Sequence, residues 1–217
     1  MKTILTATAV LALAAAANAD VISAKITADN HYALYTGDNS SVTLVGRNEM
    51  GSGGNPGTYN WSEPEDYSFN SGAFIYIVAW SDDSVAQGLM AQITGLTDTY
   101  HSGDSRWQVY PTFISRGDGD AEPDAAELIG HLTNADANNL WQNIAVGGGN
   151  GMSPWGLIPG IGEAPRWMWV NNPEQVDPFN GGSGYGETLV FRMAVPTPGA
   201  AAALGLGGLT GLRRKRR

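Results

Sequence analysis

The sequence predicts an all-β fold, a single β-sandwich or jelly roll with one or two short helices, flanked at both ends by apolar segments. Many short runs are rich in β-branched and aromatic residues. They are separated by turns drawn from 29 Gly and 11 Pro residues, whereas a helical pattern is confined to one region. Many short strands with Gly/Pro punctuation are typical of sandwiches.

The first strand is expected at residues 22–28, where apolar Ile and Ala alternate with Ser, Lys and Thr, as in a half-buried strand. Residues 74–80 read Phe-Ile-Tyr-Ile-Val-Ala-Trp and have no polar face. A strand of this kind is expected at the centre of a sheet, covered on both sides. The other predicted strands are residues 32–36, 42–45, 89–93, 106–110, 166–170 and 188–194.

The principal helix is expected at residues 123–132, where Leu128, Ile129 and Leu132 share one face. A weaker helical pattern covers residues 138–145. The Gly-rich stretches at 46–57 and 147–151 predict loops, because Gly favours turns and weakens regular elements.

The composition predicts one domain without disulfides. The chain has no Cys, and residues 20–195 are about 175 in number, enough for a single core. Six of the 12 Lys and Arg are Lys2 and the five C-terminal residues, so this body carries six basic against 21 acidic residues, a formal charge of −15. Such a balance argues against nucleic acid as a partner.

The N-terminus has the pattern of a secretory signal peptide at residues 1–19. Lys2 supplies a positive charge, an apolar run follows, and Ala17-Asn18-Ala19 is an A-x-A cleavage site. The expected mature domain is therefore residues 20–194, in an exported protein.

The C-terminal residues 195–217 join a proline hinge, an apolar run and a basic cluster. The hinge is Val195-Pro196-Thr197-Pro198-Gly199, and the cluster is Arg213, Arg214, Lys215, Arg216 and Arg217. The apolar residues 200–212 would span roughly 20 Å as a helix, less than the ~30 Å hydrocarbon core. They predict transient anchoring in the inner membrane, with the basic cluster on the cytoplasmic side.

This order of parts resembles the PEP-CTERM sorting signal, although Thr197 stands where the family's name places Glu. The resemblance implies an exosortase-type sorting protease and the secretion machinery as partners. It also implies a final location at the cell surface or in the extracellular matrix, beside exopolysaccharide.

The body resembles galactose-binding-like jelly-roll domains. The segments that carry this resemblance are residues 28–35, 45–46, 76–80, 87–91, 105–109, 167–169 and 190–192. Members of that fold often bind sugars, and others only pack against neighbouring domains, so the fold does not by itself assign a function.

No catalytic motif is recognisable. The sequence lacks a Gly-x-Ser-x-Gly elbow, a His-Glu-x-x-His motif and a Cys nucleophile. Its three His residues lie on separate segments without ligand spacing. Glu63-Pro64-Glu65-Asp66 could furnish a carboxylate pair for glycoside hydrolysis, but proline-held acidic loops are common, and an ordinary acidic loop is the preferred interpretation. The chain is therefore expected not to be an enzyme.

Residues 118–124 form the one candidate cation loop. Asp118, Asp120, Glu122 and Asp124 alternate with other residues, and flexible acidic loops can surround Ca²⁺. The loop departs from an EF-hand, because position 6 is Pro123 and position 12 is Ile129. The alternative role is to cap the helix that follows.

Tryptophans divide between a core set and a set near loops. Trp80, Trp107, Trp167 and Trp169 lie in predicted strands and are expected in the core. Trp61, Trp141 and Trp155 lie near loops beside Asn, Ser and Gly. Exposed indoles next to polar groups can bind sugars, whereas the alternative is that these rings plug the open ends of the sandwich.

Three functions follow from these observations. The first is a non-enzymatic exported surface or matrix protein that binds carbohydrate, with extracellular polysaccharide as the partner. The second is a structural or adhesion protein without a small ligand, and the third is a secreted glycoside-active enzyme.

Overall fold

The computed structural model describes residues 21–48, 61–81, 86–96, 98–117, 120–171, 177–180 and 188–196. All strands and the helix given below lie in the unit Ala19–Val195. The predicted signal peptide and the sorting tail from Thr197 onward lie outside the described residues, as does Asp118.

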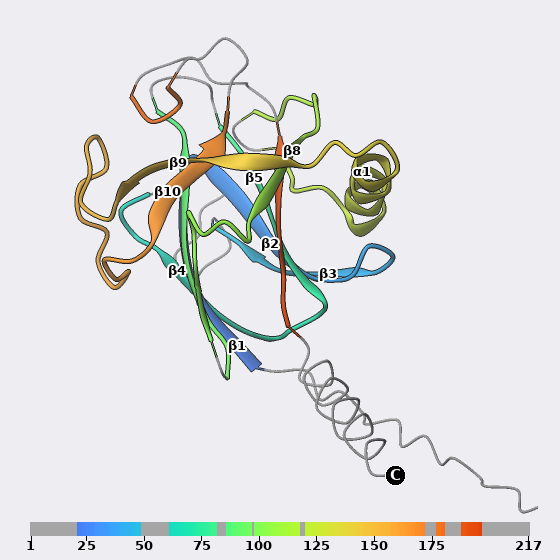
Figure 1. The fold of residues 1–217 in the computed structure, drawn as a ribbon, viewed down its shortest axis with the longest axis horizontal. Helices are drawn as coiled ribbons and strands as arrows, with labels where there is room; N and C mark the ends of the chain where they lie inside the picture. Colours follow the sequence, from blue (N-terminus) through green and yellow to red (C-terminus); the bar gives the residue numbers. More distant parts are fainter. Residues whose placement is uncertain are drawn as a thin grey trace, which may run out of the picture. The chain divides into compact units, whose positions relative to one another are not determined.

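The regular structure described in this unit is antiparallel strands together with one helix, so the all-β prediction is confirmed (Figure 1). The first six strands are β1 (Val21–Asp29), β2 (His31–Gly37), β3 (Val42–Arg47), β4 (Glu65–Asn70), β5 (Phe74–Trp80) and β6 (Gly88–Thr94). The others are β7 (Thr99–His101), β8 (Gln108–Pro111), β9 (Gln142–Gly149), β10 (Arg166–Val170) and β11 (Leu189–Ala194), and the helix is α1 (Ala125–Ala137).

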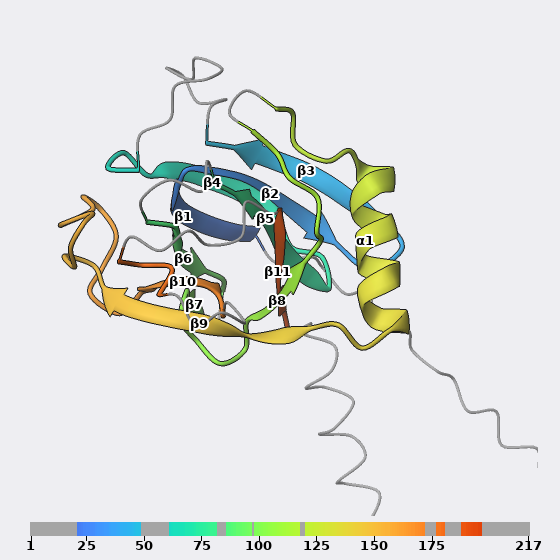
Figure 2. The same cartoon turned by 90° about the horizontal axis from the view of Figure 1, so that it is seen from above.

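The strands follow the order β3-β2-β5-β11-β8-β9-β10-β6-β1-β4, and β7 pairs with β6. Strand β9 joins the two halves, because its first residues pair with β8 and the rest pair with β10 (Figure 2). The end strands β3 and β4 also approach each other. A Cβ atom on Gly46 of β3 would lie 2.6 Å from the Tyr67 ring of β4. The sheet is therefore sandwich-like and nearly closed on itself.

Strand β5 lies between β2 and β11 and is buried on both faces, as predicted. One face contributes Ile75, Ile77 and Ala79 to the interior cluster. The other contributes Tyr76, Val78 and Trp80 to a second cluster, which includes Leu128, Leu132 and Ala135 of α1. Because both faces have apolar partners, a continuous apolar strand is stable here without exposing a patch.

The four core tryptophans are confirmed: Trp80, Trp107, Trp167 and Trp169 are all fully buried. Trp167 and Trp169 both belong to the interior cluster, so they are buried together, as strand alternation predicts.

Helix α1 begins two residues later than predicted and extends further. Asp124 is the N-cap, and its carboxylate accepts a 2.8 Å hydrogen bond from the Glu127 backbone N–H. The buried residues face β3 and the outer side of the sheet, and α1 lies beside β3 in Figure 2.

Two sequence expectations are wrong. The weaker helix at 138–145 does not form, because α1 ends at Ala137 and Gln142–Gly149 is strand β9. The Gly-rich stretch at 147–151 is not simply a surface loop, since Gly147 to Gly149 end that strand. In both cases pairing with β8 and β10 outweighs local propensity.

Candidate functional site

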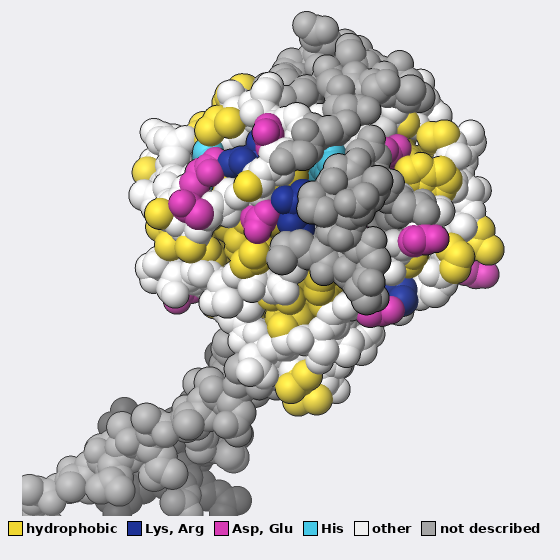
Figure 3. All heavy atoms as spheres, turned by 180° about the vertical axis from the view of Figure 1, so that it is seen from behind, with side chains coloured by type: hydrophobic (Ala, Val, Ile, Leu, Met, Phe, Trp, Pro, Cys, Tyr) yellow, Lys and Arg dark blue, Asp and Glu magenta, His cyan; other side chains and the backbone are white. Residues whose placement is uncertain are grey.

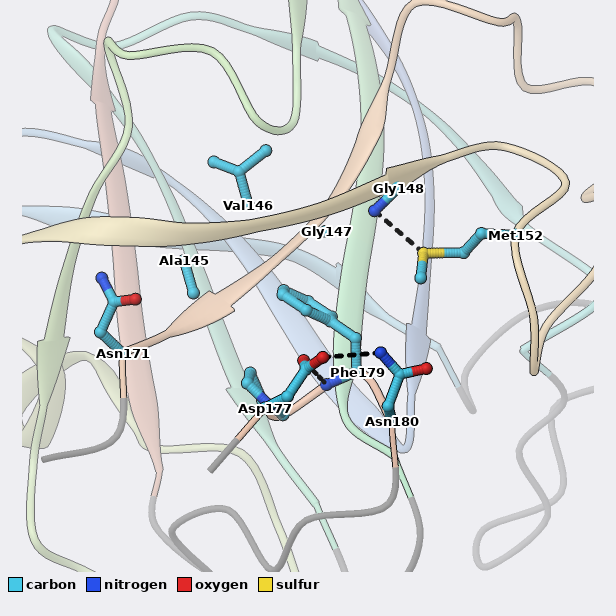
Figure 4. A pocket seen from close by; sticks show the side chains of 10 residues that line it. Ala145, Val146, Gly147, Gly148, Met152, Asn171, Asp177, Phe179 and Asn180 are labelled. Atoms are coloured by element: carbon cyan, nitrogen blue, oxygen red, sulfur yellow. Dashed lines mark hydrogen bonds between the residues drawn. The ribbon is translucent and has the colours of Figure 1, made fainter. Parts of the chain in front are cut away.

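A cavity of about 620 Å³ opens beside the second half of β9 (Figure 4). Its volume lies within the usual range for small-molecule sites. The residues that line it are Ala145, Val146, Gly147, Gly148, Met152, Asn171, Asp177, Pro178, Phe179 and Asn180. We call this cavity the β9 pocket.

One wall of the β9 pocket is a β-bulge. Val146 pairs with Met168 and Gly149 pairs with Arg166, so Gly147 and Gly148 together oppose Trp167. Bulges of this kind disrupt the ladder locally and are frequent beside functional sites.

Glycine at both bulge positions lets the neighbouring side chains approach the backbone closely. A Cβ atom on Gly147 would lie 3.0 Å from the Phe179 ring, and one on Gly148 would lie 2.7 Å from the Met152 sulfur. The backbone itself therefore forms this wall of the pocket.

The opposite wall is a short turn at residues 177–180. Asp177 accepts hydrogen bonds from the Phe179 backbone N–H at 2.9 Å and from the Asn180 side-chain amide at 2.6 Å. The Pro178 carbonyl accepts from the Gln87 N–H at 2.8 Å, which ties the turn to the start of β6. Figure 4 shows the Phe179 ring between this turn and β9.

The pocket combines an apolar floor with a polar rim. Phe179 and Ala145 are buried, whereas Asn171, Asp177 and Asn180 are exposed. The two amides can donate and accept, and the carboxylate can accept. Asp177 is the only charged residue of the described lining, whereas glycoside hydrolysis uses two carboxyl groups.

The three tryptophans predicted near loops do not form one platform. Trp141 packs with the cluster beneath α1, whereas Trp61 and Trp155 pack with the interior cluster. The indole N–H of Trp141 donates to Asp136 at 2.7 Å, and the guanidinium of Arg192 lies 3.7 Å from its ring centroid. One face of this ring is therefore occupied by protein.

Trp155 is buried, with 3% of its surface exposed. Its ring stacks on Trp167 at a centroid distance of 4.0 Å, and its N–H donates to Asp29 at 2.7 Å. Its edge-on contact with Phe179 places it behind the pocket floor. Trp155 thus has the plugging role that was the alternative to sugar stacking, while supporting the β9 pocket from within.

The acidic loop divides its carboxylates among different partners. Asp120 accepts from the Gly117 N–H at 2.7 Å, Glu122 pairs with Arg47 at 2.9 Å, and Asp124 caps α1. Within the described ranges, no group of three or more His, Cys, Asp or Glu side chains is placed to hold a metal. The capping role of Asp124 is confirmed, and calcium binding stays a prediction.

The carboxylates of β4 point to opposite faces of the strand. Glu65 accepts a 2.8 Å hydrogen bond from the Tyr32 hydroxyl, which also lies 2.8 Å from the Tyr67 hydroxyl. Burial raises the pKa of Glu65 to about 7, against the lowering effect of the Tyr32 hydrogen bond. Asp66 is exposed and pairs with Lys25 at 2.6 Å. Glu65 and Asp66 therefore do not converge on one site.

Of the hinge of the predicted sorting signal, the first two residues, Val195 and Pro196, lie within the described residues. Val195 is buried, and its N–H donates to the Ala73 carbonyl at 2.9 Å, whereas Pro196 is exposed. Thr197, Pro198, Gly199 and the basic cluster lie outside the described residues. In the described part of the chain, none of the helices has the length and hydropathy of a membrane span.

The pocket residues were not among the sites predicted from the sequence. The Gly run at 147–149 directly after an apolar stretch was the available signal, since Gly in a strand marks a bulge or a close approach. Nothing local connects that run to the turn at 177–180. No family model, curated protein or solved structure matches the chain.

Proposed function

We propose that this protein is a non-enzymatic, exported surface or matrix protein that binds carbohydrate in the β9 pocket. The observation that carries the proposal is the arrangement of the pocket, in which a polar rim of two amides and a carboxylate surrounds an apolar floor. Sugars present apolar C–H faces together with hydroxyl groups, and they fit sites that combine apolar surface with a few placed polar groups.

The charge distribution favours a partner without many negative charges. Five of the six basic residues of the body form ion pairs, namely Lys25, Arg47, Arg106, Arg116 and Arg192. On the face in Figure 3, described basic side chains lie beside acidic ones and do not form a continuous stripe. Polyanions such as nucleic acids depend on such a basic footprint, so a neutral polysaccharide is the better partner.

The two terminal segments are the basis for the proposed export and for the proposed location at the cell surface or in the matrix. The body is a jelly roll of the galactose-binding-like kind, exported through the signal peptide and sorted by an exosortase through residues 195–217. The antiparallel, nearly closed sheet is compatible with this assignment. The resemblance of the tail to PEP-CTERM signals supports a location beside exopolysaccharide.

A glycan array probed with the labelled full-length chain tests carbohydrate binding. We expect binding to at least one neutral glycan, and we expect Asn171→Ala with Asn180→Ala to weaken it at least tenfold, or about 1.4 kcal/mol. Leu157→Thr is the matched control, because Leu157 is 73% exposed and does not line the pocket. A silent array, or equal binding by the double variant with an unchanged melting midpoint, would refute the proposal.

A structural or adhesion role is the second candidate, favoured by Phe113. This residue has φ 60° and is 70% exposed, between two backbone hydrogen bonds that tie Thr112 and Ile114 to Thr188. A bulky residue in the left-handed region is costly and is often retained for function. Loss of cell-surface adhesion in Phe113→Ser, together with a silent array, would favour this role.

A further inference from the structure

The backbone N–H of Gly148 has an unusual partner at the wall of the β9 pocket. It donates to the thioether sulfur of Met152 at 3.0 Å, where an ordinary strand would offer a carbonyl oxygen (Figure 4). This follows from the bulge, because Gly147 and Gly148 oppose the single residue Trp167. A thioether is a weak acceptor, so a ligand oxygen that replaced it would form a stronger hydrogen bond.

The pocket also offers an acceptor and apolar surface. The Asp177 carboxylate is exposed at the rim and has lone pairs beyond the two hydrogen bonds of its turn. Met152, Ala145 and Phe179 contribute apolar lining. A backbone donor, a carboxylate acceptor and an apolar surface correspond to the three parts of an acetamido group, namely its C=O, its N–H and its methyl.

From this correspondence we infer that the β9 pocket selects N-acetylated amino sugars, a conclusion that rests on the proposed carbohydrate function. The acetamido oxygen accepts from the Gly148 N–H in place of Met152. The acetamido N–H donates to Asp177, and the methyl group packs against the apolar lining. A plain hexose would place a hydroxyl against that apolar surface, with a loss of affinity.

Acidic sugars are disfavoured by the same lining. The pocket lining contains Asp177 and no basic residue. Arg166 donates to the Gly147 carbonyl at 2.8 Å, but its side chain is not part of the lining. A uronic acid would therefore meet a like charge without a cation to offset it.

Isothermal titration of the full-length chain with four sugars tests the inference: N-acetylglucosamine, N-acetylgalactosamine, glucose and glucuronic acid. We expect at least one N-acetyl sugar to bind tenfold or more tightly than both glucose and glucuronic acid, a difference of about 1.4 kcal/mol. A smaller preference would overturn the inference and leave carbohydrate binding standing. Failure of all four sugars, together with a silent array, would overturn both.

The amide resonance of Gly148 gives a second, site-specific readout. N-acetyl sugar should shift this resonance, and Met152→Leu should strengthen its binding severalfold, because Leu keeps the apolar volume and removes the competing sulfur. Leu157→Thr, as the control, should leave both the affinity and the resonance shift unchanged. If the sugar binds while the Gly148 resonance stays in place, the assignment of this donor is wrong.

Discussion

At the scale of single residues, Glu65 shows how burial changes the chemistry of a side chain. It lies on the inward face of β4, where the sheet nearly closes, and the Tyr32 hydroxyl donates to it. Burial also raises the pKa values of Tyr32 and Tyr67, so these hydroxyls stay neutral at physiological pH. The three side chains form a partly buried polar network between β2 and β4.

Glu65 should make the protein less stable as the pH rises from about 4.5 to about 7. Its pKa is about 7 in the folded chain, against a usual value of 4.5. The folded state therefore holds a proton that the unfolded chain releases in this window, and the stabilisation present at low pH is lost. We expect a loss of roughly 1–3 kcal/mol, reduced by partial exposure, measured by urea unfolding at about pH 5 and about pH 8.

Glu65→Gln is the control for this prediction. The amide keeps an acceptor for Tyr32 and does not titrate, so its unfolding free energy should change less over the same pH range. Burial lowers the pKa of His131, which gives an opposite slope in both proteins and cancels in the comparison. Equal pH profiles for the two proteins would contradict the assignment.

At the scale of elements, β5 is the central strand, and its two faces serve different clusters. Ile77→Ala should cost about 2–5 kcal/mol, because Ile77 is fully buried in the interior cluster and its truncation leaves a cavity. This is a large part of the roughly 5–15 kcal/mol of a typical domain. Urea unfolding measures it, with exposed Thr43→Ala as the control. A change within 0.5 kcal/mol (about the scatter of surface substitutions) would contradict the central placement of β5.

Two experiments on the loop before α1 distinguish a helix-capping role of its acidic residues from calcium binding. Asp124→Asn keeps a side-chain oxygen for the Glu127 N–H, whereas Asp124→Ala removes it and should cost about 1 kcal/mol. If the loop binds Ca²⁺, the ion should stabilise the native chain by about 2.7 kcal/mol at a hundredfold excess over Kd, and its melting midpoint should rise. Thermal melts with chelator and with Ca²⁺ measure this, and an unchanged midpoint would leave these acids with the capping role alone.

The strands that could be predicted from the sequence are those in which the residues of the strand itself show the hydrophobic pattern of a buried strand. Strands β5 and β10 have the predicted bounds, because every residue after the first in each strand is apolar and buried. Strand β4 starts with acids, and β9 ends in three glycines, so neither carries that pattern locally. These two strands depend on partners that are distant in the chain.

At the scale of the whole molecule, the site is assembled from segments that the sequence keeps apart. The β9 bulge and the turn at 177–180 meet because β10 pairs with β9 and the turn is tied to β6 through Gln87. Such an encounter is set by sheet topology, which local patterns do not encode. The three tryptophans considered as ligand-binding candidates are separated in the same way, since they pack with two different clusters.

The terminal basic cluster should control sorting of the whole molecule. If residues 195–217 are the proposed sorting signal, replacing residues 213–217 with neutral residues should change membrane retention and processing, because basic clusters keep adjoining apolar segments on the cytoplasmic side. Cell fractionation and the mass of the surface form measure this. Arg166→Gln, an exposed cation of the body, is the control. Identical display and mass for the neutral variant and the native chain would contradict a sorting role.

A crystal structure of the chain with the strongest ligand from the glycan array would test carbohydrate binding in the β9 pocket most directly. We predict a sugar in the pocket, with hydrogen bonds to at least two of Asn171, Asp177 and Asn180 and an apolar contact with Phe179. A sugar bound elsewhere, against Trp61 or Trp141 for example, with the β9 pocket empty, would contradict the proposed site.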